Sequence, residues 1–205
     1  MSSDLQYVSG DAPSGGLYRD VTDFAHDTPG WVHRLAEYGT EGGVLVLLAL
    51  LAVACWRLRR AEPRMLALAL LGLPAVAVAY GISETVKLAV REERPCRAVA
   101  GAATPIAPCP EPGDWSFPSN HATIAAATAV AVVLVWRAAA WVVLPLAVLT
   151  AFSRVFVGVH YPHDVAAGMA LGVTVVMLVA WAAGRPAAAL TARVRARTDY
   201  TSPAS

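Results

Sequence analysis

A short segment between two apolar stretches carries residue types that could perform nucleophilic catalysis. His160 follows Arg154 after five intervening residues, and Asp164 comes four positions after His160. Pro162 is typical of the first turn of a helix, so Asp164 would fall within that turn and could orient the His160 ring. A histidine oriented by a carboxylate is an activated pair, and a neutral imidazole can itself attack phosphorus. We expect His163 to project from a different helix face and interpret it as a bystander.

A second group, Phe117-Pro-Ser119-Asn120-His121, stands directly before another apolar stretch. Ser119 is a favoured residue type for a helix N-cap, where the backbone N–H groups of the first turn are free. These groups and the helix dipole attract phosphate. His121 would stand beside such an anion and could protonate a leaving oxygen. Taken alone, the same residues fit a plain helix cap followed by an interfacial histidine.

Three cations, Lys87, Arg91 and Arg94, recur at i, i+4 and i+7 and would stack on one helical face before Pro95 ends the helix. Crowded cations repel one another unless an anion lies among them. Arginine can bind phosphate through two hydrogen bonds at once, and lysine acts as a point charge. Arg154, at the end of an apolar stretch, also needs an anionic partner. The alternative is a set of ordinary basic residues that contact lipid headgroups, with nearby glutamates as partners.

A metal site is the competing interpretation of the same residues. His121, His160, His163 and Asp164 are all possible zinc ligands. Lysine and arginine side chains converging on that pocket would repel a dication and hold a phosphate dianion. We therefore predict a site that uses no metal and no other cofactor.

The elements that position these residues are indicated by the composition of the chain. Of its 205 residues, 57% are hydrophobic and only 15% are charged, with a mean hydropathy of +0.52. A soluble domain carries about 25% charged residues. A membrane-spanning helix needs roughly 20 residues, so the shorter apolar stretches must extend into polar flanking residues. The pattern predicts an all-α, polytopic membrane bundle with five spans, at Gly42–Trp56, Met65–Ser83, Ala122–Trp136, Ala138–Phe152 and Val165–Ala183.

The segments outside these spans complete the predicted organisation. Residues 1–16 are polar and are predicted to be a disordered leader. Residues 17–37 are predicted to form an amphipathic segment. That segment is either an interfacial helix or a short extramembrane helix that packs on the bundle, and the pattern does not decide between them. We assign the membrane domain to residues 17–184 and a basic tail to 185–205. The net charge of +1 gives no argument for a nucleic-acid partner.

Arginine counts in the short loops predict the orientation. Residues 57–64 carry four arginines, Arg137 lies in the third loop, and four more arginines lie in the tail after the last span. These three segments alternate with the other loops and belong on the cytoplasmic side. The loop over 84–120 and the connection over 153–164 then face the extracytoplasmic side of the cell membrane, and both carry the polar groups described above.

Two of the three cysteines, Cys96 and Cys109, share the loop that is predicted to face outward. In an oxidising compartment they could form a disulfide. The alternative, two free thiols, is equally compatible with the sequence. Cys55 lies within an apolar stretch and is expected to be inert packing.

Together, K-x6-R-P, P-S-N-H and S-R-x5-H-x3-D resemble, in order and spacing, the three signature motifs of the type-2 phosphatidic acid phosphatase (PAP2) superfamily. The motifs run from Lys87 to Asp164. Asn120 departs from the family pattern, which usually has glycine or aspartate there, and we expect little loss because that position contributes mainly backbone. Arg91 lies outside the pattern.

The resemblance implies a role for each matching position. His160 attacks phosphorus and becomes phosphohistidine, Asp164 orients it, and His121 protonates the leaving group and later assists hydrolysis. The side chains expected to bind the phosphoryl group are Lys87, Arg94, Ser119 and Arg154, together with the backbone around Asn120.

Within the superfamily, the chain looks most like the bacterial undecaprenyl-diphosphate phosphatases of the bacitracin-resistance type. The resemblance therefore implies hydrolysis of undecaprenyl diphosphate to undecaprenyl phosphate, with the substrate held within the bilayer. Phosphatidic acid, phosphatidylglycerophosphate or another lipid phosphate is an alternative substrate. A non-catalytic lipid-phosphate binder or transporter is less consistent with the sequence, because both His160 and Asp164 are present. The oligomeric state is left open.

Overall fold

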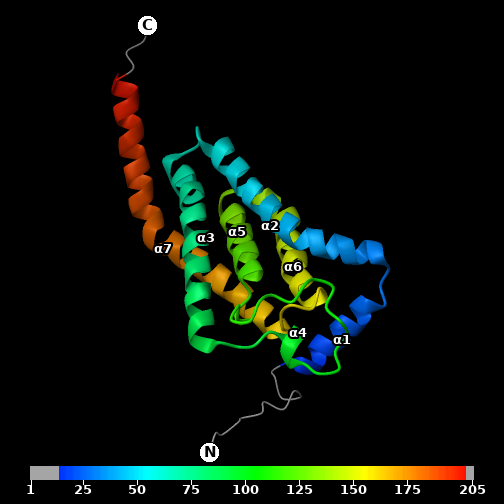
Figure 1. The fold of residues 1–205 in the computed structure, drawn as a ribbon. Coiled ribbons are helices and arrows are strands. Elements are labelled where there is room, and N and C mark those ends of the chain that lie inside the picture. The colour runs from blue at the N-terminus through cyan, green and yellow to red at the C-terminus, as the bar shows by residue number, and fades with distance from the viewer. Residues whose placement is uncertain (1–13, 202–205) are drawn as a thin grey trace, which may run out of the picture.

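The computed structural model describes residues 14–201, so most of the predicted leader and the last four residues lie outside it. The described chain is a bundle of helices without strands (Figure 1), which confirms the predicted fold class. The helices in chain order are α1 Gly15–His26, α2 Gly30–Leu58, α3 Pro63–Val90, α4 Pro95–Ala98, α5 Asn120–Val135, the single 3₁₀ turn η1 Arg137–Ala139, α6 Ala140–Phe156 and α7 Pro162–Thr201.

Each of the five predicted spans corresponds to one helix, and four of these helices are long and apolar enough to cross a membrane. The fifth, α5, has only 16 residues. The helices extend beyond the apolar stretches, as in α2, which begins at Gly30 rather than Gly42. The last helix also continues past the predicted span end at Ala183, so residues 185–201 form no separate element.

The short helix α5 is the centre of the bundle and contacts α2, α3, α6 and α7. Its buried positions are mostly alanine and threonine, which lets neighbouring backbones approach closely. Gly168 and Gly172 on α7 lie directly against α5: a Cβ added at Gly172 would stand 2.9 Å from the backbone nitrogen of Ala127. This close packing brings the start of α7 beside the start of α5, where the Ser119 N–H donates to the Asp164 carbonyl oxygen at 3.1 Å.

The predicted amphipathic segment over residues 17–37 divides between two helices. Its first part forms α1, and its second part is the first two turns of α2. Tyr18 of α1 is fully buried and donates its hydroxyl to the Gly158 carbonyl at 2.9 Å, and burial raises the pKa of Tyr18 to about 12. Of the two alternatives, the structure therefore supports a short helix that packs on the bundle.

The loop between α3 and α5 covers the same end of the bundle as α1 (Figure 1). It contains α4 and a disulfide between Cys96 and Cys109, with a Cα–Cα separation of 6.0 Å. The backbone N–H groups of Ile106 and Ala107 donate to the Val157 carbonyl, which ties this loop to the turn between α6 and α7. All of the predicted site residues lie at this end, and the end of α7 points the opposite way.

Candidate active site

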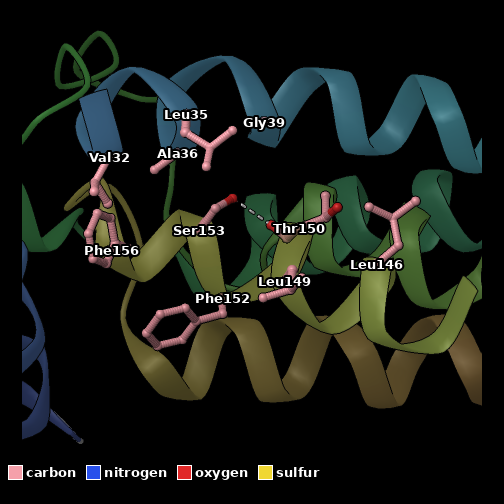
Figure 2. A pocket seen from close by; sticks show the side chains of 10 residues that line it. All are labelled: Val32, Leu35, Ala36, Gly39, Leu146, Leu149, Thr150, Phe152, Ser153 and Phe156. Atoms are coloured by element: carbon pink, nitrogen blue, oxygen red, sulfur yellow. Dashed lines mark hydrogen bonds between the residues drawn. The ribbon is translucent and has the colours of Figure 1, made fainter. Parts of the chain in front are cut away.

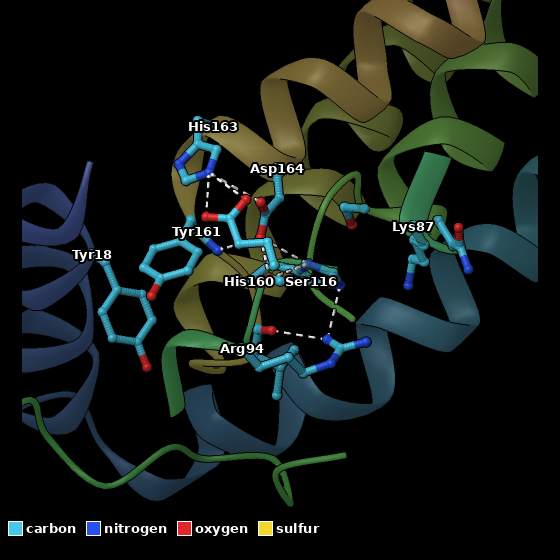
Figure 3. Close-up of polar contacts among 12 residues, drawn as sticks. Tyr18, Lys87, Arg94, Ser116, His160, Tyr161, His163 and Asp164 are labelled. Carbon is cyan, nitrogen blue, oxygen red and sulfur yellow. Dashed lines mark hydrogen bonds and ion pairs between the residues drawn. The ribbon is translucent and has the colours of Figure 1, made fainter. Parts of the chain in front are cut away.

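His160 lies in the turn between α6 and α7, beside the first residues of α7 (Figure 3). Gly158 shapes this turn with a φ of +84°, and a Cβ there would collide with Pro105. His160 is 1% exposed, and its Nδ1 lies 3.2 Å from Oδ2 of Asp164. The predicted pairing of these two residues is present.

The Asp164 carboxylate is held by more groups than the sequence indicated. Its Oδ2 accepts hydrogen bonds from the Tyr161 backbone N–H at 2.8 Å and from the Ser116 hydroxyl. Asp164 is fully buried, and a buried carboxylate needs such donors to remain ionised. The carboxylate is thereby fixed to accept the proton on Nδ1 of His160.

The opposite ring nitrogen of His160 faces a cation. Arg94 places Nη1 3.1 Å from Nε2 of His160 and donates from the same atom to the Val159 carbonyl at 2.9 Å. A guanidinium can only donate, so Nε2 is the acceptor and carries the lone pair, while Nδ1 carries the proton. This is the tautomer that a nucleophilic Nε2 requires.

The electrostatic surroundings keep His160 neutral. Burial lowers its pKa to about 3, and the nearby charges of Arg94 and Arg154 act in the same direction. The hydrogen bond and the charge of Asp164 oppose this shift but do not overcome it. The imidazole is therefore unprotonated near neutral pH, and its Nε2 keeps the lone pair that accepts the hydrogen bond of Arg94.

Two of the three predicted stacked cations converge, and the third does not. Lys87 and Arg94 are both buried, and both approach Oδ1 of Asp114, at 3.5 Å and 2.9 Å. Arg91 adopts a left-handed conformation with φ of 54°, ends α3 and is exposed, with its Nε on the Leu88 carbonyl. The expected three-residue face is wrong because the helix ends at Val90, before Arg94 could continue its spiral.

Asp114 lies between these cations and is an anionic partner of both. Burial by itself would raise the pKa of Asp114, but the hydrogen bond and charge of Arg94 and the charge of Lys87 lower it below its usual value. The side chain is half-exposed at 50%, so it sits at the mouth of the site. Nothing in the local sequence indicated this carboxylate.

Arg154 and Ser119 bring further donors to the same place. Arg154 is 9% exposed and donates from Nη1 to Oγ1 of Thr40 at 3.3 Å, while its Nε has no hydrogen-bond partner among the described residues. Ser119 stands at the N-cap of α5, as predicted, but its hydroxyl makes no capping bond and is likewise buried without a partner in residues 14–201. Buried donors of this kind fit an anion that binds between them.

His121, at the start of α5, contacts α2 and makes no hydrogen bond to His160 or Asp164 within residues 14–201. Its Nε2 lies 2.7 Å from Oε1 of Glu41, and its side chain is 24% exposed. Asn120 is also turned outward: it accepts from Ser83 at 2.7 Å and donates to Glu84 at 2.5 Å, both on α3. The Asn120 side chain thus fastens α5 to α3, and its backbone remains at the helix start.

His163 is part of the network, which contradicts the expectation that it projects away from Asp164. Its Nε2 lies 3.3 Å from Oδ1 of Asp164 and 3.0 Å from Oε1 of Glu92. Glu92, His163 and Asp164 form the one group among the described residues whose ligand atoms cluster closely enough for a metal ion. The zinc set considered above is not assembled, because His121 pairs with Glu41.

An apolar groove of about 350 Å³ opens between α2 and α6 (Figure 2). Its walls include Leu35 and Gly39 on α2 and Leu149, Phe152 and Phe156 on α6. The next residue after Gly39 is the Thr40 that contacts Arg154, so the groove begins one residue away from the polar site. No such groove was predicted, because it depends on the pairing of two helices distant in sequence.

A model of the PAP2 superfamily matches residues 65–186, more than half of the chain. The chain therefore belongs to the PAP2 superfamily, and it is a multi-pass membrane lipid phosphatase.

Among curated relatives, a decaprenylphosphoryl-5-phosphoribose phosphatase of Mycobacterium tuberculosis is 37% identical over 161 residues, covering 75% of this chain and 81% of the relative. Undecaprenyl-diphosphatase BcrC of Bacillus subtilis is 31% identical over 133 residues, covering 64% of this chain and 65% of the relative.

Two solved structures share the fold. A transmembrane PAP2-type phosphatidylglycerolphosphate phosphatase from Bacillus subtilis aligns with a TM-score of 0.60 at 23% identity, covering 80% of this chain and 83% of that one. LpxE of Aquifex aeolicus aligns with a TM-score of 0.64 at 19% identity, covering 83% and 96%. At these identities the similarity concerns the helix arrangement alone.

Proposed function

We propose that this enzyme hydrolyses a polyprenyl-linked phosphate through a phosphohistidine on His160. The observation that carries the proposal is the state of that ring: Asp164 accepts the proton of Nδ1, and Nε2 points its lone pair at the cationic pocket. Alanine at Asp164 would remove the acceptor of the Nδ1 proton, and alanine at His160 would remove the attacking nitrogen.

The chemistry proceeds in two steps that use the groups around His160. The phosphoryl group binds in the place of the Asp114 carboxylate, on Lys87 and Arg94 and on the donors of Arg154 and Ser119 that have no partner within residues 14–201. Nε2 attacks phosphorus while the bond to the leaving oxygen breaks and His121 gives that oxygen a proton. Water then attacks the phosphohistidine, passes its proton to His121, and inorganic phosphate leaves. No step uses a metal.

A polyprenyl chain as the lipid part is supported by the two curated relatives, whose names both specify a polyprenyl substrate. The apolar groove beside Thr40 offers a place for such a chain. Undecaprenyl diphosphate is one candidate. Decaprenylphosphoryl-5-phosphoribose, a phosphate monoester, is the second, and the higher identity over a longer segment favours it.

The decisive experiment is a phosphate-release panel with the purified chain in detergent. The substrates are decaprenylphosphoryl-5-phosphoribose, undecaprenyl diphosphate, phosphatidic acid and phosphatidylglycerophosphate. We expect both polyprenyl compounds to exceed the two glycerophospholipids in kcat/KM by at least about tenfold. A preference for either glycerophospholipid would refute the polyprenyl assignment, and full inhibition by a chelator would refute the metal-free mechanism.

The nucleophile is tested by trapping. Brief incubation with a ³²P-labelled substrate and alkaline quenching should leave acid-labile label on the wild type and on H26A, a control that changes an exposed histidine on α1. The H160A variant should carry no label and release no phosphate. Labelled H160A would contradict the assignment of His160.

We further propose that the site faces the extracytoplasmic side. The arginine distribution supports this orientation, as does the disulfide in the site loop, because disulfides persist in oxidising compartments. In intact cells, a thiol reagent that cannot cross the membrane should label Cys96 and Cys109 only after mild external reduction. Labelling that requires permeabilised cells would reverse the orientation.

A further inference from the structure

Helix α2 contributes two adjacent residues to the site although it lies wholly outside the segment that matches the superfamily. The match covers residues 65–186, and α2 ends at Leu58. Thr40 is 4% exposed and accepts a hydrogen bond from Arg154, and Glu41 lies 2.7 Å from His121. The same turn of α2 therefore contacts both a phosphate-binding cation and the histidine on the leaving-group side.

Glu41 is unusual for its place in the sequence. It directly precedes the apolar stretch of α2, and the next acidic residue along the chain, Glu62, lies beyond that helix at the N-cap of α3. Charged side chains in or beside membrane spans commonly pair with another polar group, and the partner of Glu41 is His121. An exposed ion pair contributes little to stability, and the Glu41 side chain is 68% exposed, so fold stability does not account for this pair.

We propose that Glu41 is a positioning residue that acts through His121. An ionised carboxylate only accepts hydrogen bonds, so it holds the Nε2–H of His121 and favours the ring with both nitrogens protonated. Nδ1 is then the atom that gives its proton to the leaving oxygen as the bond to phosphorus breaks. In the second step Nδ1 takes a proton from the attacking water, while Nε2 keeps its proton and donates it in a hydrogen bond to Glu41 throughout. This inference rests on the proposed function.

The role predicts a dependence on the leaving group. An alkoxide leaves only with protonation, whereas p-nitrophenolate is a weak base that leaves without it. Loss of a general acid should therefore slow hydrolysis of an alkyl phosphate far more than that of p-nitrophenyl phosphate. A residue that only supports the fold, or only binds phosphate, would affect both substrates equally.

The test compares kcat/KM of the purified full chain on dodecyl phosphate and p-nitrophenyl phosphate, since kcat/KM reports formation of the phosphohistidine. For E41Q we expect a loss of about 10- to 100-fold on dodecyl phosphate and less than about threefold on p-nitrophenyl phosphate. The matched control is E37Q, one turn earlier on α2, where the glutamate has no ion pair or side-chain hydrogen bond within residues 14–201. E37Q should match the wild type on both substrates.

A double-mutant cycle separates positioning from a general effect. In an H121Q background, E41Q should cause no further loss on dodecyl phosphate, because the two residues act as one unit. Equal losses on both substrates, unchanged rates on both, or additive losses in the cycle would each overturn the role of Glu41. If E41Q fails to fold in detergent, E41D carries the same comparison, with partial recovery expected. Inactivity of the wild type on both substrates would instead reject the proposed function, and the inference with it.

Discussion

At the scale of single residues, the site depends on two buried groups that each have several partners. Asp164 receives donors from the backbone of Tyr161, from Ser116 and from His160, and Arg94 binds a carbonyl, the ring of His160 and Asp114. Each partner restricts the rotation of the side chain that it contacts. The lone pair of His160 is therefore aimed before any substrate arrives, and such preorganisation lowers the cost of reaching the transition state.

The lowered pKa of His160 makes the stability of the protein depend on pH. Its pKa is about 3 in the folded chain, and the ordinary value is about 6.5. Between these values the unfolded chain binds a proton that the folded chain does not, so stability falls as the pH falls from about 6.5 toward 3. We expect the Tm in detergent to decrease from pH 7 to pH 5, and to decrease less in H160Q. The H26A control should lose as much Tm between pH 7 and pH 5 as the wild type. If H160Q also loses as much Tm as these two proteins, His160 is not buried in its neutral state.

The Asp114 carboxylate should compete with phosphate for the cations. Its pKa lies below the ordinary value, so it is ionised at neutral pH and holds Lys87 and Arg94. In D114N the inhibition constant of inorganic phosphate is expected to fall about twofold to fivefold, the range for half-exposed charge pairs. E111Q, an exposed glutamate in the same loop, should leave the constant unchanged. Weaker phosphate binding in D114N would show that the carboxylate supports the site instead of competing for it.

At the scale of elements, the motifs lie at helix ends, and the helices that meet there determine what surrounds them. The spacing of His160 and Asp164 could be read from the sequence because four residues place both in one turn. Asp114, Ser116 and Glu41 could not be predicted, because their partners are brought to them by other helices and loops. Arg91 was assigned wrongly because the spacing assumed a helix that in fact ends before Arg94.

The groove between α2 and α6 should distinguish lipid from soluble substrates. A Cβ at Gly39 meets no atom within 4 Å, and Gly39 lines the groove, so a leucine there would take up space inside it. G39L should raise KM for a polyprenyl phosphate substrate about tenfold, the scale of excluding apolar groups from a pocket, and leave kcat/KM for p-nitrophenyl phosphate unchanged. G42L, which also has open space but lies outside the groove, is the matched control. Equal KM values for G39L and G42L would show that the polyprenyl chain of the substrate binds outside this groove.

At the scale of the whole molecule, hydropathy was sufficient to predict five apolar helices separated by polar connections. It could not predict their lengths, because Gly39, Thr40 and Glu41 interrupt the apolar pattern while the helix continues through them. Nor could it predict that α5 would be central and short. That arrangement follows from the small side chains of α5, which only become informative once the neighbours of that helix are known.

The close packing of α5 against α7 should be needed for both fold and activity, because it joins the two helix starts that carry Ser119 and Asp164. In G172V the added side chain would collide with the backbone of Thr123 and Ala127. We expect a loss of about 1–3 kcal/mol in stability, the usual cost of overpacking, visible as a lower Tm in detergent, together with reduced kcat. G81V, at an open position on α3, should behave like the wild type. A fully active and stable G172V would show that this contact is dispensable.

The length of α7 has a practical consequence. Its 40 residues make roughly 60 Å of helix at 1.5 Å per residue, about twice the hydrocarbon thickness of a bilayer, and the helix bends along this length (Figure 1). Arg195, near the end of α7, donates to the carbonyls of Arg59 and Ala61 in the connection between α2 and α3, so this part of α7 lies at the end of the bundle opposite the site. A soluble domain fused in helical register to the end of α7 would give this small membrane enzyme a visible marker for electron microscopy. The marker would lie at the end of the molecule opposite the candidate active site.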